Sequence, residues 1–310
     1  MNRHLINHFI AFLQQQERTL LTPKGYPSDL SHFAHWFETT HAEILTLAGI
    51  TPTDVRQYRQ HMLRIEKCSA HTIKRRLATL TGFLDWGVHT GQIEYNRGQD
   101  VQHVPNVPEG PKYLDQREQA VLQRTLEKDV QYARLRYPKR WMVRQRDASL
   151  VTFLLHTGLR LQEALALCLE DVQLTAQKGQ MLVRGGKGGK QRIVPLNTDA
   201  RQALQKWLAI RPESYPDAHV WIPIEGTYTG GLSSRSVQRM IQRYGQEAGL
   251  DHLTPHMLRH TFGKNLVDSG VGLETVAALL GHANLNTTRR YLTPNQHDLE
   301  DAVEQISTQN

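Results

Sequence analysis

The stretch that decides the fold begins at residues 254–262, which read Thr-Pro-His-Met-Leu-Arg-His-Thr-Phe. Thr254 followed by Pro255 predicts a helix start, because a hydroxyl caps the first amides and a proline in the first turn leaves no amide unpaired. One face of the helix carries polar side chains at i, i+3 and i+4: His256, Arg259 and His260. The opposite face, which we expect in a core, carries Leu258, Phe262 and Leu266.

The residues that follow continue the same pattern of a helix ending at polar side chains. An apolar run that includes Val276 and Leu280 stops at Gly281, a residue well suited to end a helix, and His282 comes next. We expect a polar turn over residues 284–288, after which the chain reads Arg289, Arg290 and Tyr291.

These residue types suit chemistry on a phosphodiester. A guanidinium gives planar, permanently charged donors to phosphate oxygens, and an imidazole exchanges protons near neutral pH. A tyrosine hydroxyl, with a free pKa of about 10, needs a base or cations to become a nucleophile. Each residue alone is more often structural, but the combination is much rarer by chance.

Two motifs carry a resemblance to a known family. His256-Met-Leu-Arg259-His260, then Leu-Gly281-His282 and Tyr291, resembles the C-terminal signature of the tyrosine recombinases, also called the phage integrase family. Upstream, residues 157–165 read Thr-Gly-Leu-Arg-Leu-Gln-Glu-Ala-Leu and match the other box of that family. The resemblance covers nearly the whole chain and is strongest from about residue 145.

The resemblance implies a site-specific DNA recombinase in which Tyr291 attacks the scissile phosphate and becomes joined to the 3′ end. The implied catalytic residues are Arg160, Lys187, His256, Arg259, His282 and Tyr291. The two arginines would hold the non-bridging oxygens, His256 would accept a proton, and His282 would donate a hydrogen bond to the phosphate. Glu163 would support Arg160 rather than act chemically.

Residues 181–184 and 191–194 are β-rich runs around a glycine-rich stretch, which predicts a hairpin with residues 185–190 at its tip. It is not a P-loop, because the strand–loop–helix context and the Lys-[Ser/Thr] ending are missing. In the family such a hairpin carries a lysine that protonates the leaving 5′ oxygen. Lys187 matches that position, and Lys190 is the alternative.

The first hundred residues repeat apolar side chains at helical intervals without a strand pattern, which predicts a bundle of four to five helices. This region resembles the family's core-binding, SAM-like domain. Three adjacent cations without acidic partners at i±4 favour phosphate contacts over a solvated face: Lys74, Arg75 and Arg76.

Two further basic segments lie in the second half of the chain. A helix expected to be capped by Ser234 carries, at i, i+4 and i+8, Arg235, Arg239 and Arg243. Its other side is apolar, so the cationic stripe suits a helix laid against a DNA groove. The stretch from Tyr132 to Arg146 is also strongly basic, and we interpret it as a DNA-facing loop.

Length and composition bound the architecture. The 310 residues suit two domains, which we place at 1–104 and 113–310 with a proline-rich linker at 105–112. The expected fold is mainly α: a helical core-binding domain, then an α+β catalytic domain with a small antiparallel sheet. Two cysteines in unrelated contexts and the lack of a signal peptide or membrane-spanning run favour the cytoplasm.

The formal charge of +7 and pI near 9.4 indicate a polyanionic partner. We expect double-stranded DNA with an inverted-repeat core site, no membrane, and no metal or other cofactor, because the sixteen histidines are scattered and His256/His260 lacks the Glu of a zinc helix.

The tail carries an apolar stripe at Leu299, Ala302, Val303 and Ile306, predicting a helix that docks on a neighbouring protomer in a tetramer on DNA. The alternatives are a type IB topoisomerase-like nicking–closing enzyme and a catalytically idle DNA-binding protein.

Overall fold

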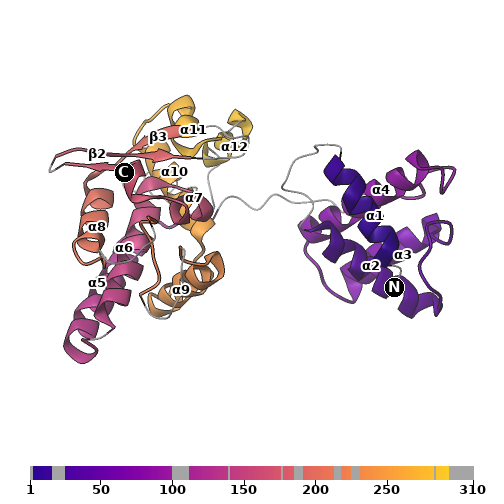
Figure 1. Ribbon diagram of the computed structural model, residues 1–310, viewed down its shortest axis with the longest axis horizontal. Helices are drawn as coiled ribbons and strands as arrows, with labels where there is room; N and C mark the ends of the chain where they lie inside the picture. The colour runs from indigo at the N-terminus through magenta and orange to yellow at the C-terminus, as the bar shows by residue number, and fades with distance from the viewer. Residues whose placement is uncertain are drawn as a thin grey trace, which may run out of the picture. The chain divides into compact units, whose positions relative to one another are not determined.

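The chain divides into two compact units, residues 1–108 and 109–310, each described below by itself (Figure 1). The computed structural model describes residues 3–15, 25–99, 112–138, 140–175, 177–184, 191–212, 218–224, 231–282 and 284–292. Except for Lys112, the predicted linker lies outside the described residues. None of the described helices is long and apolar enough to cross a membrane.

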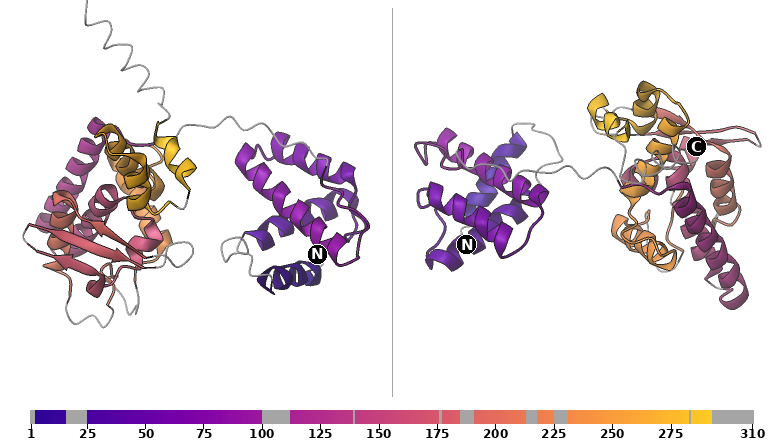
Figure 2. Two further views of the ribbon diagram at one scale, coloured as in Figure 1. Left: turned by 90° about the horizontal axis from the view of Figure 1, so that it is seen from above. Right: turned by 180° about the vertical axis from the view of Figure 1, so that it is seen from behind.

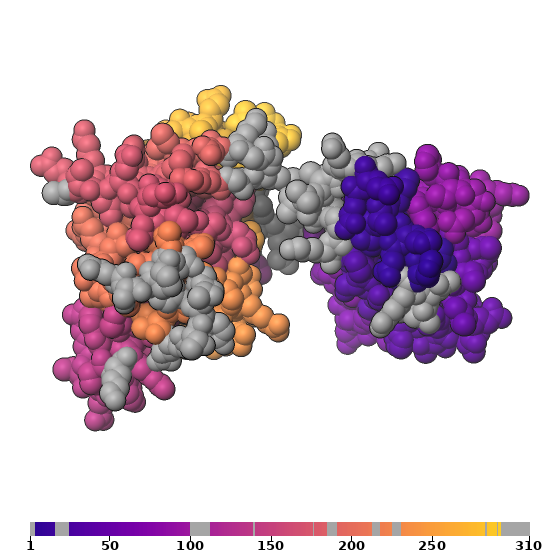
Figure 3. All heavy atoms as spheres, viewed as in Figure 1, coloured from indigo at the N-terminus to yellow at the C-terminus, as the bar shows by residue number. Residues whose placement is uncertain are grey.

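The described part of the first unit is a bundle of four helices, as the apolar spacing predicts. They are α1 (Arg3–Gln15), α2 (Tyr26–His41), α3 (Pro52–Arg64) and α4 (Ala70–His89). An aromatic core that includes Phe33, Tyr58 and Phe83 holds them together, and α1 lies at the surface of its unit (Figure 3). Helix α4 begins where Ser69 Oγ accepts the amide of Thr72 at 3.2 Å.

The second unit combines helices with a small sheet, the mainly α architecture that the sequence indicates. Its helices are α5 (Gln116–Arg136), α6 (Trp141–Thr157), α7 (Leu161–Leu165), α8 (Thr198–Leu208), α9 (Ser234–Glu247), α10 (Pro255–Asp268), α11 (Leu273–Leu280) and α12 (Leu285–Arg289). Two 3₁₀ turns are η1 (Leu169–Asp171) and η2 (Arg290–Leu292), and the strands are β1 (Val172–Leu174), β2 (Gly179–Val183) and β3 (Arg192–Pro195).

Helix α6 is the centre of this unit and packs against α5, α8 and α10. Its Leu150, Phe153 and Leu154 are almost completely buried, and Phe153 packs against Trp221 of the same core. Because the helix is covered on several sides, its last turn is held firmly in place. That turn leads to Arg160, the first predicted catalytic arginine, which is the N-cap residue of α7.

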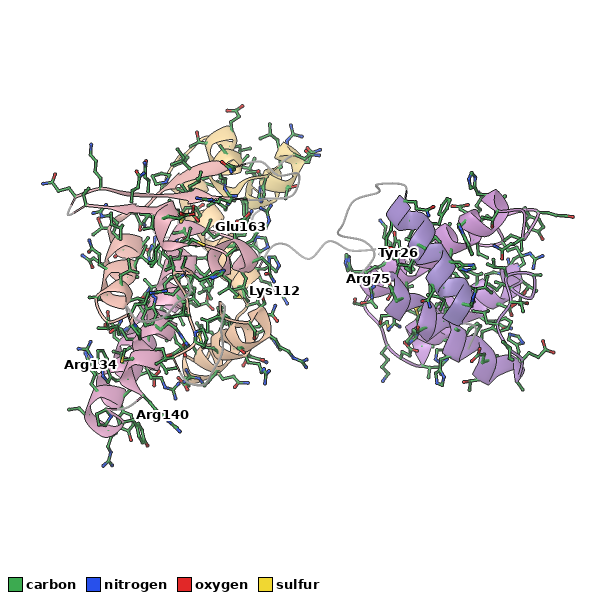
Figure 4. All side chains as sticks on the ribbon, in the orientation of Figure 1. Tyr26, Arg75, Lys112, Arg134, Arg140 and Glu163 are labelled. Carbon is green, nitrogen blue, oxygen red and sulfur yellow. The ribbon has the colours of Figure 1, made fainter. Side chains whose placement is uncertain are left out.

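The prediction that residues 132–146 form a loop is wrong. The first five residues belong to α5 and the last six to α6, and Figure 4 shows Arg134 and Arg140 near the end of this helical hairpin. Arg146 is buried, bound to Asp147 at 2.6 Å and to the carbonyl of Ile222 at 3.0 Å. A helix buried on several sides has no single apolar stripe, so its periodicity is weak and its start is hard to see.

The three strands form an antiparallel sheet in the order β1-β2-β3 along one side of the unit (Figure 2). Met181 pairs with Val194 and Val183 pairs with Arg192, which confirms the predicted hairpin. Its tip, residues 185–190 with Lys187 and Lys190, lies outside the described residues.

Two local predictions need correction. Ser233, not Ser234, caps α9, because its Oγ accepts the amide of Ser236 at 3.2 Å. The polar segment expected as a turn at 284–288 contains the short helix α12. Both errors concern neighbouring polar residues, several of which favour caps and turns equally.

Helix α6 ends at Gly158, whose φ of 61° lies in the left-handed region. A Cβ here would clash with Phe262 and lie 2.8 Å from Leu280 Cδ2. Gly249 has a φ of 68° but nothing within 4 Å of its added Cβ.

We therefore expect Gly158→Ala to destabilise the second unit by roughly 2–5 kcal/mol, through left-handed strain and overpacking together. Gly249→Ala should cost only about 1–2 kcal/mol, from strain alone. Urea unfolding followed by tryptophan fluorescence measures both, and equal losses would show that the space at Gly158 is not limiting.

Candidate active site

The C-terminal end of α11 is the point on which the candidate site converges. The last carbonyls of a helix have no partner within it and carry the negative end of the helix dipole. Three arginines donate to three consecutive carbonyls here: Arg192 Nε to Leu279 at 3.0 Å, Arg259 Nη2 to Leu280 at 2.6 Å and Arg160 Nη2 to Gly281 at 3.1 Å. The helix end therefore fixes three guanidiniums side by side.

Glu163 is the carboxylate that these arginines share. It accepts the backbone amide of Arg160 at 2.9 Å and Arg160 Nη1 at 2.8 Å, as a capping side chain does. Arg192 donates to both carboxylate oxygens at 3.1 and 2.9 Å, and Arg259 Nη1 lies 3.9 Å away. Burial alone would raise the pKa of Glu163, but the hydrogen bonds from Arg192 and Arg160 lower it to about 2. Glu163 is therefore ionised at neutral pH.

The two arginines of the family motifs differ in exposure. Arg259 is 4% exposed and also donates to the carbonyl of Gly158 at 2.7 Å. Its burial, assisted by the charge of Arg160, lowers its pKa to about 10, which leaves it charged at neutral pH. The Arg160 side chain remains 37% exposed, so an anion arriving from solvent can reach it.

Tyr291 lies in η2 and is only 2% exposed. Its ring packs so closely on α10 that a Cβ on Gly263 would lie 2.7 Å from Tyr291 Cζ. Its hydroxyl lies 3.1 Å from His260 Nδ1. The ring of His282 is nearly parallel to that of Tyr291, at 11° and 6.3 Å between centroids, and His282 Nδ1 lies 2.9 Å from Thr288 Oγ1.

The structure thus brings together five of the predicted residues from four elements and their flanks: Arg160, Glu163, Arg259, His282 and Tyr291. His256 is exposed in the first turn of α10, one turn before His260. Lys187 lies outside the described residues. Among the residues that are described, no three histidine, cysteine or acidic side chains gather as metal ligands would.

Sequence reasoning gave no role to two residues of this cluster, Arg192 and His260. Strand alternation contained a signal for Arg192, since it shares a face with the buried Val194, and a charge facing inward needs a partner. Residue spacing also put His260 beside Arg259, but its contact with Tyr291 joins residues 31 positions apart. Such a contact has no local signature.

The predicted DNA contacts of the first unit are partly engaged within the protein. Arg75 pairs with Asp29, and Arg76 donates to Glu66 at 3.0 Å and lies 3.1 Å from His32 Nε2. These cations have no acidic partner at i±4 on α4, but Asp29 of α2 and Glu66 of the α3–α4 connection pair with Arg75 and Arg76. Lys74 is exposed.

The cationic stripe on α9 is likewise uneven. Arg235 and Arg239 are exposed, whereas Arg243 binds Glu247 at 2.8 Å and lies over the ring of Tyr244 at 4.2 Å. The apolar side is buried as expected, and Tyr244 Oη donates to Asp129 of α5 at 2.6 Å. The stripe therefore offers its first two arginines to solvent.

Comparison with known protein families gives matches over both units. Residues 125–297 match the phage integrase family, and residues 6–91 match the phage integrase N-terminal SAM-like domain. Together the two matches cover the candidate active site and the helical bundle.

Similar proteins span nearly the whole chain. A TnP I resolvase from Bacillus thuringiensis is 28% identical over 305 residues, 96% of this chain and 97% of the relative. A tyrosine recombinase XerC from Corynebacterium efficiens is 30% identical over 290 residues, 93% and 86% of the two chains. Among solved structures, the XerH recombinase bound to difH substrate in a pre-cleavage complex is 25% identical, with a TM-score of 0.69 over 92% of this chain and 79% of that one. The chain belongs to the phage integrase family, the tyrosine recombinases, which cleave and rejoin DNA at specific sites through a 3′-phosphotyrosine intermediate.

Proposed function

We propose that Tyr291 is the nucleophile of this recombinase and that Arg160 and Arg259 bind the scissile phosphate. The observation that carries the proposal is the convergence of both guanidiniums and the Tyr291 segment on the end of α11. The tyrosine oxygen forms a bond to phosphorus as the bond to the 5′ oxygen breaks. Because the phosphotyrosine conserves the bond energy, the 5′ hydroxyl of a partner strand reverses the step without a nucleotide cofactor.

The two arginines supply the electrostatic part of this mechanism. Each can donate to a non-bridging oxygen, and together they offset the charge that grows in the pentavalent transition state. Glu163 keeps Arg160 in place and remains ionised while it does so. The two guanidiniums supply the positive charge that metal ions supply in other phosphoryl-transfer sites. The proposed step therefore includes no metal ion.

Proton transfer falls to the remaining residues of the family motif. In this proposal His256 accepts the proton of the tyrosine hydroxyl, and His282 donates a hydrogen bond to the phosphate. Lys187 donates a proton to the leaving 5′ oxygen. His260, whose Nδ1 lies 3.1 Å from the Tyr291 hydroxyl, is the competing acceptor. Cleavage rates of His256→Ala and His260→Ala decide between the two imidazoles.

Tyr291→Phe should still bind its DNA site but form no covalent adduct, because the ring is kept and only the attacking oxygen is removed. The measurement is a denaturing gel after incubation with a nicked suicide substrate. Tyr244→Phe is the matched control, since it removes a buried hydroxyl from another helix and should leave adduct formation intact. An undiminished adduct in Tyr291→Phe would overturn the assignment.

For DNA recognition we propose that α9 and α4 contact the duplex, using Arg235, Arg239 and Arg243, and Lys74, Arg75 and Arg76. The exposed Lys74, Arg235 and Arg239 are available without breaking an ion pair within the described residues, whereas Arg76 and Arg243 would first have to leave a carboxylate. We therefore expect the three exposed cations to contribute more to DNA binding than the two that are already paired with a carboxylate.

Arg239→Ala should weaken DNA binding and reduce the slope of log K against log salt by about one unit, the value for one lost phosphate contact. Arg243→Ala, on the same helix, should change the slope less, because Glu247 already pairs with its charge. Fluorescence anisotropy between roughly 50 and 200 mM salt measures both slopes. Equal slopes for Arg239→Ala and the wild type would remove Arg239 from the interface.

The proposed partner is double-stranded DNA with an inverted-repeat core site, occupied by a homotetramer that acts in the cytoplasm. We propose that the tail after Tyr291 docks on a neighbouring protomer through Leu299, Ala302, Val303 and Ile306, a segment outside the described residues. A helix this short is unstable alone and must bury its apolar stripe. Packing on its own catalytic domain is the alternative.

Truncation after Gln296 should therefore leave binding to a single half-site nearly unchanged while abolishing cooperative filling of the paired site. Gel-shift titration of half-sites and full sites measures the two quantities separately. If the truncated protein still fills both half-sites cooperatively, the tail does not join protomers.

A further inference from the structure

Arg192 occupies a position that connects the hairpin to the arginine cluster. It is the first residue of β3, and its pairing with Val183 is the last one in register before the tip. Its side chain is only 14% exposed. Arg192 is therefore the last residue of β3 that is paired before the segment 185–190, which contains Lys187.

The guanidinium of Arg192 alone makes the hydrogen bonds that connect β3 to both α7 and α11. Two of its nitrogens donate to Glu163 of α7, and the third donates to the carbonyl of Leu279 in α11 at 3.0 Å. The group also lies against Gly281, where a Cβ would come within 2.8 Å of Arg192 Nη1. The planar guanidinium holds its donors in a fixed fork, which lets it meet both oxygens of a carboxylate and a separate carbonyl at once, whereas the compact ammonium of a lysine has no such fork.

The two phosphate-binding arginines keep other acceptors when Arg192 is removed. Arg160 still donates to Glu163 and to the carbonyl of Gly281. Arg259 still donates to the carbonyls of Gly158 and Leu280. Removal of the Arg192 side chain, in contrast, removes all three of its hydrogen bonds, which join the start of β3 to α7 and α11.

We propose that Arg192 is a positioning residue that fixes the β2–β3 hairpin on the arginine cluster, so that Lys187 can protonate the leaving 5′ oxygen. The inference rests on the proposed role of Lys187 and extends it to the residue that holds the hairpin. Arg192 itself touches neither the phosphate nor the leaving group. Its effect therefore falls on the proton-transfer step rather than on phosphate binding.

The leaving group provides a direct test. Cleavage of a normal phosphodiester releases a 5′ alkoxide that takes up a proton, whereas a 5′-bridging phosphorothioate releases a thiolate that needs none. Both substrates are given to the wild type, Arg192→Gln, Arg192→Lys and Lys187→Ala, with Arg201→Gln as matched control. Arg201 packs its Cγ and Cδ near Gly179 at the other end of the hairpin, and it donates to the carbonyl of Leu196 and to Thr198 Oγ1.

With the normal substrate, Lys187→Ala should lose roughly a hundredfold or more in cleavage rate, the usual contribution of a general acid. Arg192→Gln should lose at least about tenfold, since small misplacements of a catalytic group cost this much. With the phosphorothioate, both should cleave within about threefold of the wild type. Arg201→Gln should match the wild type on both substrates.

The outcomes separate the two claims. Failure of the phosphorothioate to rescue Lys187→Ala removes Lys187 from the proposed function. Rescue of Lys187→Ala but not of Arg192→Gln overturns the positioning role and assigns Arg192 to phosphate binding or to folding alone. Thermal melting shows whether Arg192→Gln has a folding defect. If it has, the cleavage rates of Arg192→Lys on the two substrates are compared instead, because this variant keeps the charge but not the fork.

Discussion

The site depends on how three positive charges are held together in a partly buried place. Guanidiniums this close repel one another, and burial of Arg259 costs further free energy unless acceptors surround it. The carboxylate of Glu163 and the carbonyls at the end of α11 provide those acceptors. Arg192 pairs with Glu163, so in the proposed mechanism the charges of Arg160 and Arg259 remain to stabilise a pentavalent phosphate transition state. The same arrangement therefore stabilises the folded protein and prepares it for the reaction.

Glycines make this arrangement possible by turning the chain at the ends of two helices. Gly158 and Gly281 both have positive φ, and the carbonyls at or beside them, at residues 158, 280 and 281, accept Arg259 and Arg160. Gly281 also leaves room for the guanidinium of Arg192. A side chain at either position would disturb an arginine or the apolar packing beneath it, so local backbone geometry and electrostatics are fixed by the same residues.

Local signals in the sequence predicted most of the architecture. Thr254 before Pro255 marks a real helix start, Gly281 marks a real helix end, and the β-rich runs around the glycine-rich stretch form a real hairpin. Contacts across the fold were not predictable in this way. Arg192 and Glu163 are 29 positions apart, and Asp29 and Arg75 are 46 apart. Periodicity reports which face of an element is buried, but it does not report which charged side chain on another element will meet it.

The connection between α11 and Tyr291 separates the arginines held at the end of α11 from the proposed nucleophile. The arginines bind the carbonyls of Leu279, Leu280 and Gly281, the last two residues of α11 and its C-cap. Tyr291 follows after a short helix. It packs in a small buried cluster with Val276 and Leu280 of α11 and also lies close to His260, Gly263 and the ring of His282. A displacement of residues 284–292 therefore moves the tyrosine without breaking the hydrogen bonds that hold the guanidiniums. In the proposed mechanism the buried Tyr291 hydroxyl has to reach a phosphate bound at the more exposed Arg160, and such a displacement would bring it there while the two proposed phosphate-binding arginines stay in place.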